Sequence, residues 1–115
     1  MLDLKSQNFK VGMYIRLSRE DGDKQESESI SNQRNILQRY VKENDLCFVK
    51  EYVDDGVSGT TFDRPGFNEM LQDIENKNIN MVITKDLSRL GRDYIKTGFY
   101  IEDYFPKNNV RYVAI

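Results

Sequence analysis

The sequence predicts an α/β fold, with a mostly parallel sheet of about four strands and helices on both faces. Segments with strand-like apolar patterns alternate with segments of helical spacing along the 115 residues, which is the order that a parallel sheet requires. Residues 79–84, INMVIT, are an unbroken apolar run of the kind found in strands covered on both faces. The length allows at most one domain.

The first predicted strand is residues 10–17, KVGMYIRL, and its alternating apolar positions indicate that one face is buried. Residues two apart point the same way on a strand, so Tyr14, Arg16 and Ser18 share the side opposite the aliphatic residues. An arginine and a hydroxyl are therefore expected side by side where this strand ends.

The next elements are predicted from apolar spacing and from capping residues. A helix is predicted from about Ser29 to Asn44, capped by Ser27 or Ser29, and residues 47–53, CFVKEYV, form the second strand. Pro65 opens a second helix, because its missing N–H costs little in the first turn.

The last helix and strand come after the buried run INMVIT. Asp93 is expected to cap a helix that has Pro106 near its end and runs through Ile95, Phe99 and Phe105. Residues 110–115, VRYVAI, form the fourth strand.

Composition and charge exclude several function classes. Lys and Arg number 17 and Asp and Glu number 19, so the net charge of −2 excludes a simple basic nucleic-acid tail but allows a local basic site. The single cysteine, Cys47, excludes an internal disulfide and a cysteine zinc cluster, and its apolar neighbours predict a buried side chain. Without histidine, no Ser-His or Cys-His pair can form. No stretch has the pattern of a membrane span or a signal peptide, so a cytoplasmic location is expected.

Polar and charged residues come after each of the first three predicted strands. Sites in parallel sheets form beyond the carboxyl ends of the strands, so these segments are expected to meet at one edge. The residues are Arg16 and Ser18 after the first strand, Asp54, Asp55, Ser58 and Arg64 after the second, and Lys85, Ser88, Arg89 and Arg92 after the third.

Four arginines that converge in this way repel one another, and their natural partner is a phosphate, above all a phosphoryl transition state with extra charge. The chain lacks the P-loop pattern G-x-x-x-x-G-K-[ST]. Asp54 and Asp55 are the only close carboxylate pair in the candidate loops, so no metal or other cofactor is expected. The residues leave two classes open: an enzyme with a serine nucleophile, and a non-catalytic α/β phosphate- or nucleotide-binding module whose arginines form an anion cradle. A phosphatase is a weaker third, because no histidine or cysteine supplies an acid or base.

Four ordered motifs carry a resemblance to a known family. "YIRLS", "SISNQ", "DDGVSGTTFDRPGF" and "DLSRLGRD" resemble the motifs of the serine recombinases, the resolvase/invertase family, over roughly residues 10–115. The long polar loop before "SISNQ" is more similar to the large serine recombinases of phages and mobile elements. The resemblance implies site-specific DNA recombination through a resolvase-like catalytic domain.

The resemblance also implies residue roles. Ser18 matches the nucleophile that attacks a DNA phosphodiester and becomes joined to the 5′ phosphate. The small resolvases have an aspartate where Ser88 stands, so a supporting carboxylate role cannot be carried over there. The residues that match the arginines holding the scissile phosphate are Arg16, Arg64, Arg89 and Arg92, and those that match supporting polar residues are Tyr14, Gln33, Asp55 and Ser58.

Taken one at a time, these residues also have ordinary structural explanations. Ser18 could cap a turn, and Arg64 could pair with Asp63 before a helix. Arg89 and Arg92 are one helical turn apart and could form a solvated face. The four motifs in order favour the catalytic interpretation.

The resemblance sets expectations for the wider protein. Residues 1–9 are expected to be flexible, and residues 10–115 to form an incomplete catalytic domain that lacks the family's dimer helix and DNA-binding domain. The implied partners are double-stranded DNA and further copies of the chain, as a homodimer and tetramer of the full-length protein. The isolated 115-residue chain is expected to be inactive.

Overall fold

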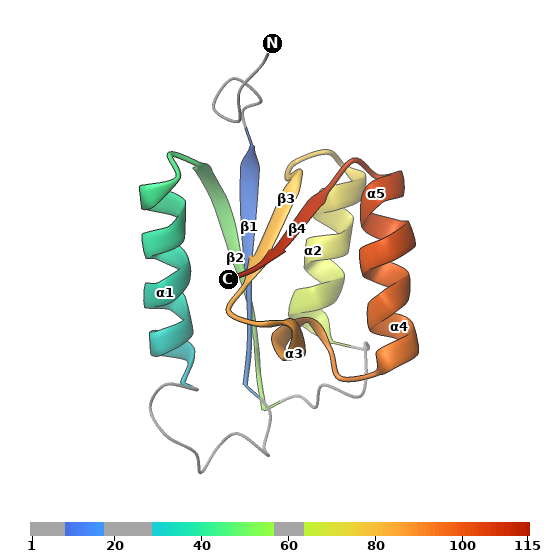
Figure 1. Ribbon diagram of the computed structural model, residues 1–115, viewed down its shortest axis with the longest axis horizontal. Coiled ribbons are helices and arrows are strands. Elements are labelled where there is room, and N and C mark those ends of the chain that lie inside the picture. Colours follow the sequence, from blue (N-terminus) through green and yellow to red (C-terminus); the bar gives the residue numbers. More distant parts are fainter. Residues whose placement is uncertain (1–8, 18–28, 57–63) are drawn as a thin grey trace.

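The structure of the protein, a computed structural model, describes residues 9–17, 29–56 and 64–115. Strands and helices alternate along these residues (Figure 1), with a π-helical segment at Tyr100–Tyr104 between two α-helical pieces. The elements are β1 (Lys10–Leu17), α1 (Ile30–Glu43), β2 (Cys47–Asp55), α2 (Pro65–Glu75), β3 (Met81–Thr84), α3 (Leu87–Leu90), α4 (Tyr94–Phe99), α5 (Phe105–Lys107) and β4 (Arg111–Ala114).

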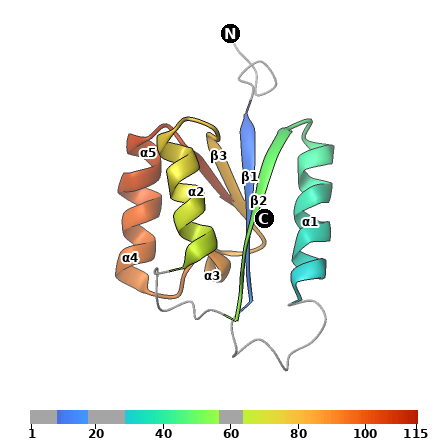
Figure 2. The same cartoon turned by 180° about the vertical axis from the view of Figure 1, so that it is seen from behind.

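The four strands form one sheet in the order β2-β1-β3-β4, and every neighbouring pair is parallel. Helix α1 covers one face, and α2, α4 and α5 cover the other (Figures 1 and 2). The predicted fold class is therefore confirmed. The connection after β1 leads to β2 on one side of the sheet, and the connection after β3 leads to β4 on the other. The crevice between the carboxyl ends of β1 and β3 is therefore where this topology places a binding site.

Two apolar clusters hold the sheet between its helices. Tyr14 and Tyr52 pack with α2 on one face, while Val11, Met13 and Ile15 pack against α1 on the other. Strand β1 is consequently buried along both faces, and the prediction of a half-buried strand was wrong. Alternate residues of β1 face two different buried clusters, because helices cover both faces of this central strand.

The helix starts largely agree with the sequence signals. The Ser29 hydroxyl accepts a hydrogen bond from the Asn32 N–H at 3.1 Å and caps α1, and the Asp93 carboxylate accepts one from the Lys96 N–H at 3.0 Å and caps α4. Pro65 occupies the first position of α2. These three predicted starts are confirmed.

The predicted helix through Ile95, Phe99 and Phe105 is not a single α-helix. The π-helical segment interrupts it, and a π turn advances the register because each bond spans five residues. Phe105 is buried, but Ile95 is 80% exposed and Phe99 49% exposed, while Thr97 is buried. Of the three apolar residues along this predicted helix, only Phe105 therefore belongs to the core.

The remaining sequence expectations concern the start of the chain and of β2. Cys47 is exposed rather than buried, because it begins an edge strand whose first half is uncovered. Phe9 packs against the α1-side cluster and its carbonyl accepts a hydrogen bond from the Cys47 N–H, whereas residues 1–8 of the segment expected to be flexible lie outside the described residues. In the described part of the chain, no helix has the length and apolarity needed to cross a bilayer.

Candidate functional site

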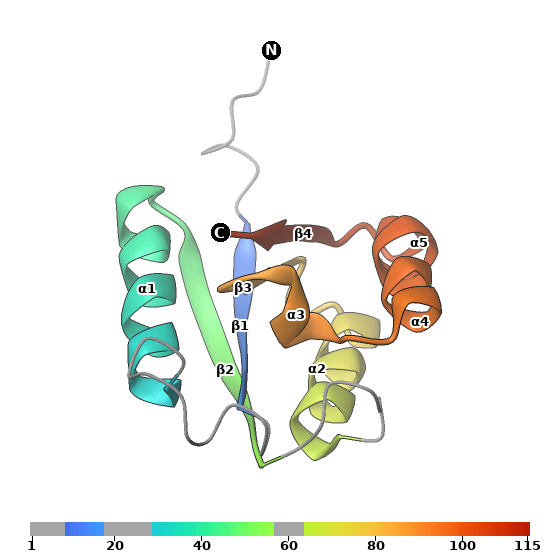
Figure 3. The same ribbon diagram turned by 60° about the horizontal axis from the view of Figure 1, so that its bottom comes forward.

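Three arginines gather where the strands end. Arg16 lies near the end of β1, Arg64 immediately precedes α2, and Arg89 lies in α3, the short helix after β3. All three side chains are buried, with exposed fractions of 2% or less. Figures 1 and 3 show α3 between β1 and α2, and in Figure 1 it lies beside the first turn of α2. The convergence predicted for these three residues is thus present in the structure.

Arg16 and Arg89 hold each other through the backbone. The Arg16 Nε donates to the Arg89 carbonyl at 3.2 Å and its Nη2 donates to the Ser88 carbonyl at 2.6 Å, while the Arg89 Nη1 donates to the Arg16 carbonyl at 2.9 Å. The buried Gln33 of α1 donates from Nε2 to the same Arg16 carbonyl at 3.1 Å. The end of β1, α3 and α1 are therefore tied together at Arg16.

Arg64 lies among aromatic rings on the α2 face of the sheet. Its guanidinium carbon is 4.8 Å from the centre of the Phe67 ring and 5.5 Å from that of Tyr14, distances at which the ring faces attract a cation. Its Nη1 donates to the Tyr14 hydroxyl at 3.0 Å and its Nη2 to the Leu90 carbonyl at 2.6 Å. Tyr14 in turn donates to Asp54 at 2.8 Å.

The site is rich in positive charge that the protein only partly offsets. Burial lowers the pKa of Arg16 to about 10, and the charges of Arg89, Arg64 and Arg92 contribute to that lowering. Burial also lowers the pKa of Arg64, while Tyr14 and Asp54 oppose that shift. Burial and the neighbouring arginines thus destabilise the charged form of Arg16, and a bound anion would offset the repulsion between the guanidinium groups.

Ser88 has a carboxylate partner next to Arg89. The Ser88 hydroxyl donates to Asp86 at 2.5 Å, and the Arg89 Nε lies 3.6 Å from the same carboxylate oxygen. Burial alone would raise the pKa of Asp86, but the Ser88 hydrogen bond and the charges of Arg89 and Lys85 outweigh it, and the pKa is lowered. A carboxylate therefore does stand beside Arg89, although position 88 itself is a serine.

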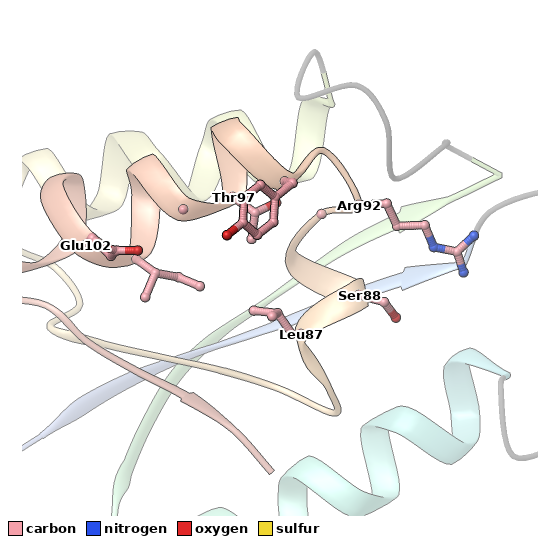
Figure 4. A pocket seen from close by; sticks show the side chains of 9 residues that line it. Leu87, Ser88, Arg92, Thr97 and Glu102 are labelled. Atoms are coloured by element: carbon pink, nitrogen blue, oxygen red, sulfur yellow. The ribbon is translucent and has the colours of Figure 1, made fainter.

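Arg92 differs from the other three arginines because its side chain is exposed. It lines, with Ser88, one end of an apolar pocket of about 520 Å³ between α3 and α4. In Figure 4 the side chains of Arg92 and Ser88 point away from Thr97 and Glu102, toward the end of β1. Arg92 is close enough to lower the pKa of Arg16, so it is the accessible member of the arginine cluster.

The other predicted site residues differ in whether they contact the arginine cluster. Tyr14 and Gln33 contact the arginine cluster, whereas Asp55 is exposed at the end of β2. Ser18 and Ser58 lie outside the described residues. No group of three acidic or cysteine side chains in the described ranges could hold a metal ion.

Of the two acidic residues of the site, Asp86 was not predicted there, and Asp54 was expected at this edge of the sheet but was given no role. The period of the strand could have indicated the place of Asp54. Asp54 lies two residues after Tyr52, so the two side chains share one face of β2. Because Tyr52 pairs with Tyr14 across the sheet, this is also the face of Tyr14. Asp86 gave no comparable signal, since its place depends on the turn between β3 and α3.

Gly66, the second residue of α2, is needed for the close approach of that helix to Asp54. A Cβ added there would lie 2.9 Å from the Asp54 Oδ2 and 3.0 Å from the backbone carbonyl of Val53. Gly66→Ala should therefore lower the free energy of unfolding by about 1–3 kcal/mol, as overpacking does, measured by urea unfolding of the chain.

Gly98 supplies the matched control. A Cβ there meets only the flexible end of Glu102, at 3.9 Å, and the residue is helical. Gly98→Ala should raise the free energy of unfolding by up to about 1 kcal/mol, because alanine has the better helix propensity. Changes of the same sign and size in both variants would contradict the packing argument for Gly66.

The fold and site define the class of protein as an α/β domain with a cluster of buried arginines at the sheet's switch point. Comparison with known proteins adds the family: the family "Resolvase, N terminal domain" matches residues 11–115. The chain therefore belongs to the resolvase family of serine recombinases, enzymes that cleave and rejoin DNA, and the predicted resemblance is confirmed.

Solved structures agree with this membership. The N-terminal catalytic domain of TP901-1 integrase is 31% identical, with a TM-score of 0.81, and the match covers 91% of this chain and 75% of that chain. A serine recombinase from Sulfolobus solfataricus is 27% identical, with a TM-score of 0.70 and coverages of 93% and 68%. A resolvase family site-specific recombinase from Streptococcus pneumoniae is 25% identical, with a TM-score of 0.74 and coverages of 93% and 72%.

Proposed function

We propose that this chain is the catalytic part of a recombinase that carries out site-specific DNA recombination by covalent serine chemistry. The Ser18 hydroxyl attacks a DNA phosphodiester, the bond to the 3′ oxygen breaks, and the 5′ phosphate becomes joined to Ser18. After strand exchange, a 3′ hydroxyl attacks the phosphoserine, restores the phosphodiester and releases the serine. Because each phosphodiester is replaced by another phosphoester, the reaction needs no ATP.

The observation that carries the proposal is the arginine cluster with its mutual repulsion. The transferred phosphoryl group gains negative charge in its transition state, and donors fixed in advance stabilise that charge without reorganising. Arg16 and Arg89 are fixed by their reciprocal hydrogen bonds, and Arg64 by Tyr14 and Leu90. The lowered pKa of Arg16 supports a site that favours an incoming anion.

The proposed partners are double-stranded DNA and other copies of the recombinase, in dimers and tetramers, acting in the cytoplasm without a metal or other cofactor. The net charge of −2 argues that the chain alone binds DNA weakly, since affinity depends on many neutralised phosphates. Most binding energy should then come from other segments or copies of the recombinase.

A test of the enzyme class is whether the recombinase that contains this chain forms a protease-sensitive covalent adduct with nicked DNA in the presence of EDTA. The anion-cradle alternative gives reversible binding and no adduct. A strict divalent-metal requirement would count against the proposed serine mechanism.

A second prediction concerns anion binding by the chain itself. Inorganic phosphate at ten times its dissociation constant should raise the free energy of unfolding by about 1.4 kcal/mol. The measurement is Tm in phosphate against chloride at equal ionic strength. Arg92→Ala should shrink this rise, because it removes the accessible arginine, whereas Arg39→Ala, an exposed arginine on α1, should keep it. An equal rise in both variants would indicate a general salt effect.

A further inference from the structure

Asp54 is a buried carboxylate on which three donors converge at the end of β2. Its exposed fraction is 4%. Its Oδ1 accepts from the Gly66 N–H at 2.8 Å, and its Oδ2 accepts from the Phe67 N–H at 2.9 Å and from the Tyr14 hydroxyl at 2.8 Å. The two N–H groups belong to the first turn of α2, where the helix dipole also favours a negative charge.

These three hydrogen bonds affect both the backbone and the guanidinium of Arg64. Arg64 is the N-cap residue of α2, so the carboxylate fixes the backbone immediately after it. The Tyr14 hydroxyl donates a hydrogen bond to Asp54 and accepts one from the Arg64 Nη1 at 3.0 Å. Asp54 is therefore linked to Arg64 through the backbone of α2 and, independently, through the Tyr14 side chain.

Tyr14 keeps this direction over the whole working range of pH. Burial raises the pKa of its hydroxyl, and the neighbouring Asp54 charge adds to the rise while Arg64 opposes it. The phenol thus stays protonated and can donate to Asp54 and accept from Arg64 at once.

We propose that Asp54 is a positioning residue for catalysis: through Tyr14 it aims the guanidinium of Arg64 at the scissile phosphate. The phosphate contact rests on the proposed recombinase function, whereas the placement of Arg64 does not. A residue that only capped α2 would need the bonds to Gly66 and Phe67, and the bond to Tyr14 would be incidental. The two roles differ in what happens when Tyr14 alone is changed.

The chain contains a second tyrosine–carboxylate pair that serves as a control. The Tyr52 hydroxyl donates to Asp73 of α2 at 2.6 Å, and Asp73 also accepts from the Asn78 side chain at 3.0 Å. Asp73→Asn therefore weakens a similar bond on the same helix away from the arginine cluster. It separates the loss of a tyrosine partner in general from the loss of the link to Arg64.

The first experiment measures the rotation of Arg64 by NMR in the 15N-arginine-labelled chain. A guanidinium held at both Nη atoms rotates slowly about its Nε–Cζ bond and gives separate Nη signals. We expect separate signals in the wild type and in Asp73→Asn, and averaged signals in Tyr14→Phe and Asp54→Asn. Tyr14→Phe keeps the α2 cap, so it remains informative if Asp54→Asn does not fold. Separate Arg64 signals in Tyr14→Phe would overturn the proposal, since the Leu90 carbonyl would then suffice.

The second experiment is a double-mutant cycle in the recombinase that contains this chain. Asp54→Asn and Tyr14→Phe should each lower the cleavage rate at saturating DNA by about 10²-fold, the scale of a misplaced catalytic group. The double variant should lose little more than Asp54→Asn alone, because both changes break the link through the Tyr14 hydroxyl. Losses that multiply would overturn the proposal. A wild type that forms no serine adduct would instead overturn the proposed function, and the Arg64 signals would still decide the role of Asp54.

Discussion

Ser18→Ala should abolish DNA cleavage by the recombinase while leaving DNA binding nearly intact. The hydroxyl is the proposed attacking atom, and alanine offers no nucleophile in its place, whereas DNA affinity comes from contacts along many phosphates. Cleavage is measured on a suicide substrate that carries a nick, and binding by gel shift at a stated salt concentration. Loss of binding in parallel with cleavage would indicate a folding or docking defect and not a missing nucleophile.

Two other serines provide matched controls for Ser18. The Ser88 hydroxyl donates to Asp86, so Ser88→Ala removes a supporting hydrogen bond worth about 1 kcal/mol, or roughly fivefold in rate. Ser31 is exposed on α1, and Ser31→Ala should have little effect on cleavage. If Ser18→Ala still cleaved and Ser88→Ala did not, the nucleophile would have to be reassigned.

Arg16→Ala and Arg89→Ala should each lower the cleavage rate by about 10²–10³-fold, because each removes a fixed donor to the transition-state charge. Their losses should not multiply in the double variant. The Arg16 side chain holds the α3 backbone at Ser88 and Arg89, and the Arg89 side chain holds the backbone carbonyl of Arg16, so removing either side chain loosens the backbone from which the other extends. The measurement is single-turnover cleavage at saturating DNA for both single variants and the double variant.

Arg92→Ala and Arg39→Ala are controls for the Arg16 and Arg89 variants, because each removes an arginine charge at an exposed position. Arg92→Ala should lower the rate with little change in Tm, because its side chain is exposed, and Arg39→Ala should change neither. Multiplying losses for Arg16 and Arg89 would mean that the two arginines act independently, contrary to their reciprocal hydrogen bonds.

The sequence predicted the sheet and most helix starts because those depend on local pattern. Alternation in residues 10–17, capping by Ser29 and Asp93, and Pro65 at a helix start are properties of short segments. Burial on both faces of β1 was not predictable from that alternation, because it depends on helices far along the chain. The π-helical segment at residues 100–104 was missed because an α-helical period was applied through a segment with a different period.

The site was predicted less completely than the fold. Topology alone brings Arg16, Arg64 and Arg89 to one edge, so their convergence could be inferred from the residues located just after each strand. Their depth of burial could not, since arginines are mostly exposed in proteins. The role of Asp54 was hidden for a related reason: it depends on the angle at which α2 approaches β2, which is set by Gly66 and by packing of Phe67.

Cleavage of DNA by Ser18 is tested by mapping the covalent bond between the recombinase and the DNA. The recombinase is incubated with a nicked suicide substrate in EDTA, the adduct is digested with protease and nuclease, and the modified peptide is sequenced by mass spectrometry. We expect a 5′-phosphonucleotide on Ser18 and no adduct in Ser18→Ala. An adduct on any other residue, or cleavage with no covalent intermediate, would contradict it.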